Sequence, residues 1–231
     1  MRVLFSVNST STDLIRSFIF VTPDAQRTMN TYIGACSLLS PKDIDDQIIK
    51  NSKITFLEGY VWEEDLAKES LVKAAEIAHK ADNKVALTLS DPFCVKKHRL
   101  EFKELIKKNI DILFANEFEA KELCQTKDLE ESAKEISSMA EIVAITRSEN
   151  GANIYNSNET VEIKAKVFNV VKDTTGAGDL FAAGFLYGLS KKFSILKSGN
   201  IAAITAGEII SHFGARPETN LLNLIKKELA D

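Results

Sequence analysis

Cysteine and proline are scarce in this chain of 231 residues, which has three cysteines and four prolines. Cys36, Cys94 and Cys124 are odd in number, lie far apart and form no C-x-x-C pair. The sequence therefore predicts neither a disulfide framework nor a zinc site. Unpaired cysteines fit a reducing compartment, so we expect a cytoplasmic protein.

Long apolar runs and an excess of basic residues are also missing. No apolar stretch reaches the length of a membrane span, and no signal-peptide pattern follows Met1. The chain has 29 Lys and Arg against 33 Asp and Glu, for a formal net charge of -4. Since such a surface has little positive charge to neutralise phosphates, we expect no nucleic-acid partner and no membrane partner.

Two common nucleotide-binding signatures are absent. No G-x-G-x-x-G follows an early strand, which weighs against a dinucleotide-dependent oxidoreductase, and the lack of G-x-x-x-x-G-K-[ST] excludes the P-loop NTPases. His79, His98 and His212 have no metal-ligand spacing, and we expect them on the surface or in helices.

What the chain does contain is an alternation of strand and helix patterns. Short apolar runs at 54–60, 84–89, 111–114 and 142–146 alternate with helical patterns at 63–80, 101–108, 117–123 and 129–138. Repeated β-α-β order predicts an α/β fold, with a mostly parallel central sheet and helices on both faces.

Other patterns lie at the two ends of the chain. Strand patterns at 17–22 and 27–32, joined by a turn, predict a hairpin, and a helix signal at Ser40-Pro41 predicts a helix to about residue 51. Later strand patterns at 152–155 and 160–165 predict a second hairpin, and helical patterns at 177–189, 195–211 and 219–229 predict three helices.

The most informative segment is Asp173-Thr174-Thr175-Gly176-Ala177-Gly178-Asp179, which lies before an Ala- and Gly-rich helix. The first N–H groups of a helix lack internal partners, so the amides of Gly176, Ala177 and Gly178 could bind a phosphate as an anion hole. Asp179 could then accept the proton of an attacking hydroxyl. The alternative is that the glycines only shape a turn and that Asp173 or Asp179 caps the helix.

The string DTTGAGDLFAAGFLYGL resembles the C-terminal signature of the ribokinase-like, PfkB-type carbohydrate kinases. The resemblance implies a ribokinase-like fold, ATP as cofactor and Asp179 as the catalytic base. Asn116 to Glu119 fits the family's N-x-x-E motif, which implies that Asn116 and Glu119 help to place Mg²⁺ and the ATP phosphates. Thr146 to Gly151 is similar to its T-x-G-x-x-G nucleotide loop, although Arg147-Ser148 departs from the usual glycine.

Further along the chain, Gly199-Asn200 and Ala203 resemble the helix that borders the adenine, and 213–217 resembles the loop that closes this pocket. Standing alone, Asn200 would be read as a hydrogen-bonded helix residue. In many relatives a monovalent cation such as K⁺ lies beside the anion hole, held largely by backbone carbonyls, and Asp173 and Thr175 are the matching positions.

The acceptor is suggested by three stretches, 27–32, 58–60 and 89–93, which are similar to bacterial adenosine kinase-type members. The resemblance implies transfer of the γ-phosphoryl group to a hydroxymethyl of a nucleoside, adenosine being favoured, or of a sugar. Arg27 could approach the phosphoryl group and Glu58 a substrate hydroxyl. Alternatively, Arg27 is a solvated hairpin charge and Glu58 only ends a strand. The sequence leaves the oligomeric state open, with a homodimer as one option.

The resemblance begins near Ser17, so we expect an N-terminally truncated family member of low solubility or activity. Residues 1–33 would be the remnant of a small β lid, and residues 34–231 the nucleotide-binding and catalytic core. The alternative function is a truncated, non-catalytic nucleotide-binding or interaction module.

Overall fold

The structure is a computed structural model that describes residues 16–230. Its central sheet has six strands whose spatial order follows the sequence. The strands are β3 (Ile54–Glu58), β4 (Lys84–Thr88), β5 (Ile112–Asn116), β6 (Ile142–Thr146), β7 (Ala152–Asn156) and β8 (Thr160–Ile163). Strands β3 to β6 are parallel, and β7 and β8 add an antiparallel hairpin. The predicted α/β fold with a mostly parallel sheet is confirmed.

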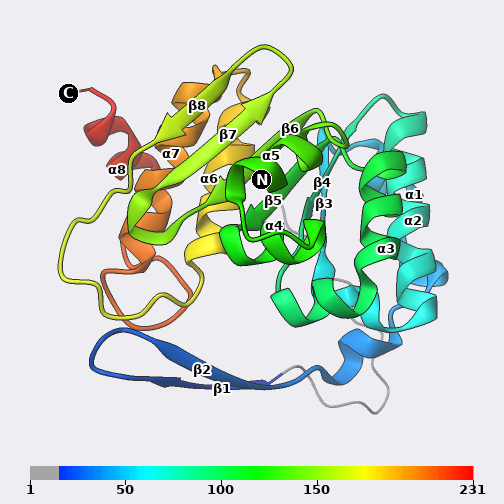
Figure 1. Ribbon diagram of the computed structural model, residues 1–231, viewed down its shortest axis with the longest axis horizontal. Coiled ribbons are helices and arrows are strands. Elements are labelled where there is room, and N and C mark those ends of the chain that lie inside the picture. The colour runs from blue at the N-terminus through cyan, green and yellow to red at the C-terminus, as the bar shows by residue number, and fades with distance from the viewer. Residues whose placement is uncertain (1–15, 231) are drawn as a thin grey trace.

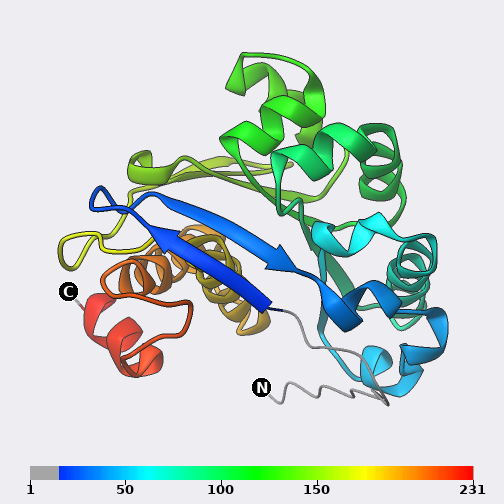
Figure 2. The same ribbon diagram turned by 90° about the horizontal axis from the view of Figure 1, so that it is seen from below.

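Eight α-helices accompany the sheet in the described part of the chain. They are α1 (Asp46–Lys50), α2 (Asp65–Lys80), α3 (Pro92–Asn109), α4 (Glu117–Cys124), α5 (Leu129–Ser137), α6 (Ala177–Ser190), α7 (Ile195–Ile209) and α8 (Leu221–Glu228). Figure 2 shows α3, α4 and α5 on one side of the sheet, with α6 and α7 on the other.

The central strands β4, β5 and β6 are mostly apolar because both faces of this part of the sheet are covered. Successive side chains of a strand point to opposite faces. Leu87 and Leu113 thus join the core cluster under α2 to α5, whereas Ala86 and Phe114 join the cluster under α6 and α7.

A separate two-stranded sheet crosses one end of the molecule. Strands β1 (Arg16–Val21) and β2 (Arg27–Tyr32) form the predicted antiparallel hairpin. Figure 1 shows it below the large sheet, beside the loops that precede α6 and follow α7. Within residues 16–230, no helix combines the length and apolarity that a membrane crossing requires.

Two helix predictions were wrong in their bounds. The helix expected from Ser40 is divided into a 3₁₀ turn, Pro41–Asp43, and α1, because Asp45 caps a new helix by accepting hydrogen bonds from the N–H groups of Gln47 and Ile48. Helix α3 begins at Pro92, earlier than expected, because Asp91 caps it in the same way.

The prediction that the histidines lie on the surface or in helices holds for His79 and His98, which are in α2 and α3, and was wrong only for His212. His79 lies on α2 with its ring 3.0 Å from Asp111, as a partly exposed surface pair. His98 in α3 and His212 after α7 are 7% and 8% exposed, so these two are buried side chains. The described residues contain no cluster of three or more His, Cys, Asp or Glu that could hold a metal ion.

Candidate active site

Helix α6 begins at an exposed tip with vacant backbone donors. Gly176 is its N-cap, with a φ of 80° that favours glycine, and no side chain caps the helix. The N–H of Ala177 donates to Thr174 O at 3.2 Å, whereas those of Gly176 and Gly178 have no partner among residues 16–230. The vacant set thus differs from the expected three amides, because the turn itself uses that of Ala177.

Asp179 lies in the first turn of α6, and its side chain is exposed. It does not cap the helix, and neither does Asp173, so the alternative interpretation of these two residues as helix caps is wrong. An unengaged carboxylate next to vacant N–H groups is the arrangement that a phosphate and an attacking hydroxyl would require.

Asp173 instead stabilises the turn before α6 through hydrogen bonds to its buried side chain. It is 3% exposed, and its Oδ1 accepts hydrogen bonds from the N–H and the hydroxyl of Thr175, at 2.9 and 2.6 Å. Its Oδ2 accepts the N–H of Gly214 at 3.0 Å. Burial opposes ionisation of Asp173, but these hydrogen bonds and the charge of Arg27 outweigh it, so its pKa lies below the ordinary value.

Arg27 joins the small hairpin to this turn. Its Nη1 donates to the hydroxyl of Thr174 at 2.5 Å, across 147 residues of sequence. Arg27 is therefore more than a solvated hairpin charge, because it ties β2 to the segment that carries the vacant amides.

Glu58 lies at the end of β3, close enough to Asp179 for the two carboxylates to interact electrostatically. Desolvation, and then the negative charge of Asp179, raise the pKa of Glu58 above its ordinary value, although the side chain remains partly in solvent. The next position, residue 59, requires glycine because a Cβ there would lie 2.4 Å from Leu89 O. The end of β3 thus packs directly on the turn after β4.

Asn116 and Glu119 form a capping box at the start of α4. The carboxylate of Glu119 accepts the N–H of Asn116 at 2.8 Å and its side-chain Nδ2 at 2.7 Å. Glu119 is 4% exposed, and desolvation raises its pKa to about 7, against the lowering effect of the Asn116 N–H. The two residues of the N-x-x-E motif are therefore mutually oriented by hydrogen bonds.

Thr146 ends β6 directly beside Asn116 in the parallel register. The loop that follows closes through a hydrogen bond from Arg147 N–H to Gly151 O at 2.7 Å. Gly151 has a φ of 79°, and a Cβ there would lie 1.9 Å from Ile163 O, so this glycine is required by close packing. The Arg147 side chain turns toward Glu162, at 3.3 Å.

The two predicted residues of α7 lie in different surroundings. Ala203 is 4% exposed and belongs to the core between α6 and α7, whereas Asn200 is partly exposed. Gly199 is a packing residue, because a Cβ there would lie 2.5 Å from the side chain of Ile163.

Sequence reasoning did not select Tyr60 and Asp91 as site residues. The pKa of Tyr60 is raised to about 12 by desolvation first and by Asp91 next, and Asp91 also acts on Glu119. Both follow the carboxyl ends of parallel strands, the edge where ligands bind in α/β sheets. Asp91 directly before Pro92 is also an N-cap signature that could have located it.

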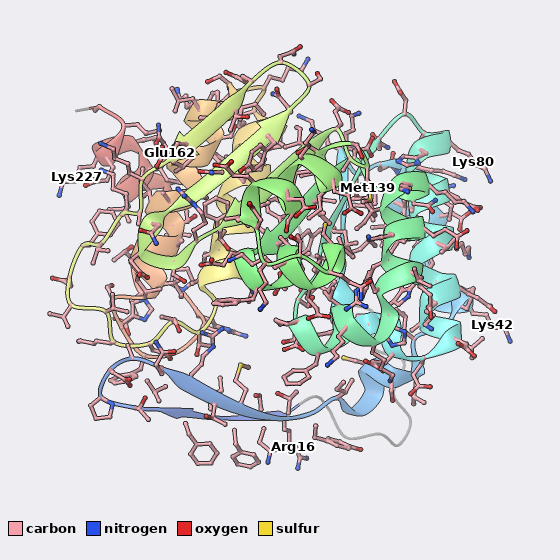
Figure 3. The ribbon with its side chains drawn as sticks, in the orientation of Figure 1. Arg16, Lys42, Lys80, Met139, Glu162 and Lys227 are labelled. Carbon is pink, nitrogen blue, oxygen red and sulfur yellow. The ribbon has the colours of Figure 1, made fainter. Side chains whose placement is uncertain are left out.

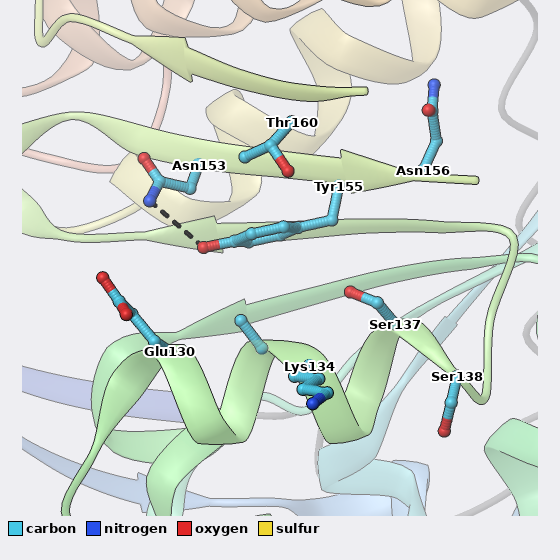
Figure 4. A pocket seen from close by; sticks show the side chains of 9 residues that line it. Glu130, Lys134, Ser137, Ser138, Asn153, Tyr155, Asn156 and Thr160 are labelled. Carbon is cyan, nitrogen blue, oxygen red and sulfur yellow. Dashed lines mark hydrogen bonds between the residues drawn. The ribbon is translucent and has the colours of Figure 1, made fainter. Parts of the chain in front are cut away.

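A surface hollow of about 560 Å³ lies elsewhere, between α5 and β7. Figure 4 shows Tyr155 and Lys134 on its walls, with Asn153 donating to the Tyr155 hydroxyl at 3.1 Å. None of the predicted site residues lines it. We place the candidate site at the α6 tip because the vacant donors and the carboxylates converge there.

Residues 5–220 match the sequence profile of the pfkB family carbohydrate kinases. The chain belongs to this family. The match begins upstream of Ser17, where we expected the resemblance to start, so that expectation was wrong; residue 5 itself lies outside the described part of the chain.

Solved structures of related family members superpose closely. A probable sugar kinase protein from Rhizobium etli is 44% identical with a TM-score of 0.90, over 93% of this chain and 65% of that one. An adenosine kinase from Sinorhizobium meliloti is 41% identical, also with a TM-score of 0.90, over 93% of this chain and 66% of that one. The ribokinase-like fold is thereby confirmed.

A ribokinase from Lactococcus lactis is 30% identical over 80% of this chain and 62% of its own length. The chain thus spans about two thirds of the length of these pfkB relatives. These relatives include a sugar kinase, an adenosine kinase and a ribokinase, which differ in acceptor. The similarity therefore identifies a family of carbohydrate and nucleoside kinases and does not identify the acceptor.

Proposed function

We propose that the chain carries the phosphoryl-transfer site of an ATP-dependent kinase. The γ-phosphoryl group of ATP would pass to a hydroxymethyl of a nucleoside, adenosine being favoured, or of a sugar. The observation that carries this proposal is the vacant N–H groups of Gly176 and Gly178 beside the exposed carboxylate of Asp179. Amides at a helix N-terminus stabilise the charge of a transferred phosphoryl group, and the carboxylate accepts the hydroxyl proton.

The acceptor would lie between Asp179 and the end of β3. Glu58 lies within electrostatic range of Asp179 and has a raised pKa, which suits it to accept a hydrogen bond from a substrate hydroxyl. Arg27 would approach the phosphoryl group, since its guanidinium already reaches Thr174 in the adjoining turn. The likeness to an adenosine kinase at 41% identity supports a nucleoside acceptor.

The nucleotide would extend from the α6 tip along the ends of β5 and β6, past Thr146 and Gly151, with Asn200 on the far side. Ala203 would take part only through packing, because it is buried in the core. Glu119 and Asn116 offer oxygen donors of the kind that Mg²⁺ prefers, and Mg²⁺ commonly takes one or two carboxylates together with phosphates and water. When bound, the ion would neutralise charge between the phosphates.

A monovalent cation such as K⁺ would lie on the backbone carbonyls of Asp173 and Thr175. Neither carbonyl accepts a hydrogen bond from residues 16–230, and the buried Asp173 carboxylate adds negative charge there. We also infer a cytoplasmic location, supported by the free thiols of Cys36, Cys94 and Cys124.

A homodimer would form through the small hairpin. Arg27 reaches Thr174 from the inner face of β2, so the alternate residues Phe18 and Phe20 lie on the outer face of β1. They are 68% and 63% exposed. Figure 3 shows side chains projecting from the lower side of the hairpin, away from the rest of the molecule.

Replacement of Asp179 by Asn tests the catalytic assignment. The amide has the shape of the carboxylate but cannot accept the hydroxyl proton, so turnover should fall by about 10²–10⁴-fold while ATP still binds. ADP release with adenosine and with ribose measures turnover, and calorimetry measures ATP binding. Near-normal turnover in Asp179→Asn would remove Asp179 from the mechanism.

Asp82→Asn provides the matched control, because Asp82 is an exposed acid far from the α6 tip, in the turn after α2. Its turnover should equal that of the unmodified chain. ATP binding without ADP release in the unmodified chain would favour the non-catalytic nucleotide-binding module instead.

A further inference from the structure

Glu208, in the last turn of α7, is a buried charge that none of the roles above uses. It is 3% exposed, as deeply buried as Asp173. Its Oε1 accepts three hydrogen bonds from the segment after α7: from the N–H of Glu218 at 3.0 Å, and from the N–H and the hydroxyl of Thr219 at 2.9 and 3.0 Å. Because a buried carboxylate is costly without such donors, these bonds indicate that Glu208 holds this segment in place.

The segment 213–219 has few other means of keeping its position. Every residue in it is exposed, and it forms no helix or strand. Near its start, the N–H of Gly214 donates to Asp173 Oδ2 at 3.0 Å. Ala215 lies against Gly176, since a Cβ added at Gly176 would be 3.4 Å from the Cα of Ala215. The segment is thus fixed at one end by Glu208 and at the other by the turn that carries the vacant amides.

His212 lies beside the other oxygen of the same carboxylate, without a hydrogen bond to it. Its ring is 8% exposed, and its Nε2 lies 3.5 Å from Glu208 Oε2. Glu208 is therefore enclosed between the end of α7 and the returning segment, and it has no contact with the place where a substrate would react. Any effect on the reaction must act through the position of the segment.

We propose that Glu208 is a positioning residue that holds segment 213–219 against the α6 tip and thereby sets the affinity for the nucleotide. This inference rests on the proposed function, because it takes the α6 tip to be the phosphate site. Without the Glu208 bonds, Gly214 and Ala215 leave Asp173 and Gly176, and the phosphate site loses one wall.

The test compares Glu208→Ala with Glu208→Gln in the full chain. Calorimetry measures ATP and adenosine binding, and amide hydrogen exchange follows Gly214, Glu218 and Thr219. Since bonds to a charged group are lost, Glu208→Ala should weaken ATP binding by about tenfold or more, leave adenosine binding unchanged and speed exchange at the three amides. Glu208→Gln keeps an acceptor oxygen and should stay within about threefold of the unmodified chain.

Glu218→Gln is the matched control, since it removes an exposed charge from the same segment and keeps both the Glu218 N–H and a side-chain oxygen near His212, which lies 3.8 Å from the carboxylate. It should bind ATP as the unmodified chain does. If Glu208→Ala does not fold, Thr219→Val, which removes one of the three bonds, should give a smaller loss of the same kind, and unchanged ATP binding in it overturns the inference.

The two proposals fail in distinguishable ways. Folded Glu208→Ala with normal ATP affinity overturns the role of Glu208 and leaves the kinase proposal intact. An unmodified chain that neither binds ATP nor releases ADP overturns the kinase proposal, and with it the nucleotide role of Glu208, while the exchange rates still report whether Glu208 holds the segment.

Discussion

At the scale of single residues, the carboxylates of the candidate site differ sharply in their environments. Asp173, Glu119 and Asp179 are all carboxylates, but hydrogen bonds lower the pKa of the first, burial raises that of the second, and the third is exposed. Sequence motifs indicated all three positions. Part of these environments comes from residues distant in sequence, such as Gly214 for Asp173 and Asp91 for Glu119.

Glu119 should make the stability of the protein depend on pH. Its pKa is raised in the folded protein from 4.5 to about 7, so its favourable contribution is complete below pH about 4.5 and is lost as the pH rises through about 7. The loss amounts to at most about 3 kcal/mol. Urea unfolding of Glu119→Gln at pH 5 and pH 8 should show a smaller difference than the unmodified chain.

Glu117→Gln, in the same turn of α4, is the control for that measurement, because Glu117 is less buried and pairs with Lys121. It should keep the pH dependence of the unmodified chain. Equal pH profiles for Glu119→Gln and the unmodified chain would show that Glu119 titrates normally.

At the scale of elements, α6 combines an open tip with a close-packed body. A Cβ at Gly178 would meet no atom within 4 Å, whereas one at Gly184 would lie 2.3 Å from Thr205 Oγ1 and 2.9 Å from Ala202 Cα. Helix α6 therefore needs glycine at position 184 in order to pack closely on α7. At Gly178, by contrast, the absence of a side chain leaves the space outside the helix tip open.

Alanine at these two positions should have opposite effects. Gly184→Ala forces α6 and α7 apart and should lower the free energy of unfolding by about 1–3 kcal/mol. Gly178→Ala should leave stability unchanged or raise it by up to about 1 kcal/mol, because alanine favours the helix, and should weaken ATP binding by crowding the phosphate. Thermal unfolding and calorimetry measure both, and an unchanged Gly184→Ala would refute the packing argument.

At the scale of the whole molecule, two sheets with different surroundings meet at the site. The six-stranded sheet is covered on both faces, while the β1–β2 hairpin exposes Phe18 and Phe20. An isolated two-stranded sheet is marginally stable in water, so the hairpin depends on contacts such as that of Arg27 with Thr174 and, as proposed above, on a second copy.

Sedimentation velocity tests the dimer. The unmodified chain should sediment as a concentration-dependent dimer, and Phe18→Ser with Phe20→Ser should sediment as a monomer because the apolar outer face is lost. Leu66→Ser, on the exposed side of α2, should leave the dimer intact. A monomeric unmodified chain at all concentrations would contradict the proposed interface.

The order of strands and helices, the hairpin and the glycine turn at the start of α6 followed from the sequence alone, because hydrophobic periodicity and glycine spacing are local properties. The division of the helix after Ser40, the burial of His98 and His212 and the engagement of Ala177 N–H were decided by the tertiary structure. So were the contacts of Arg27 with Thr174 and of Glu208 with Thr219. Each depends on groups brought together by packing, and no local pattern in the chain records which distant partner will satisfy a buried charge.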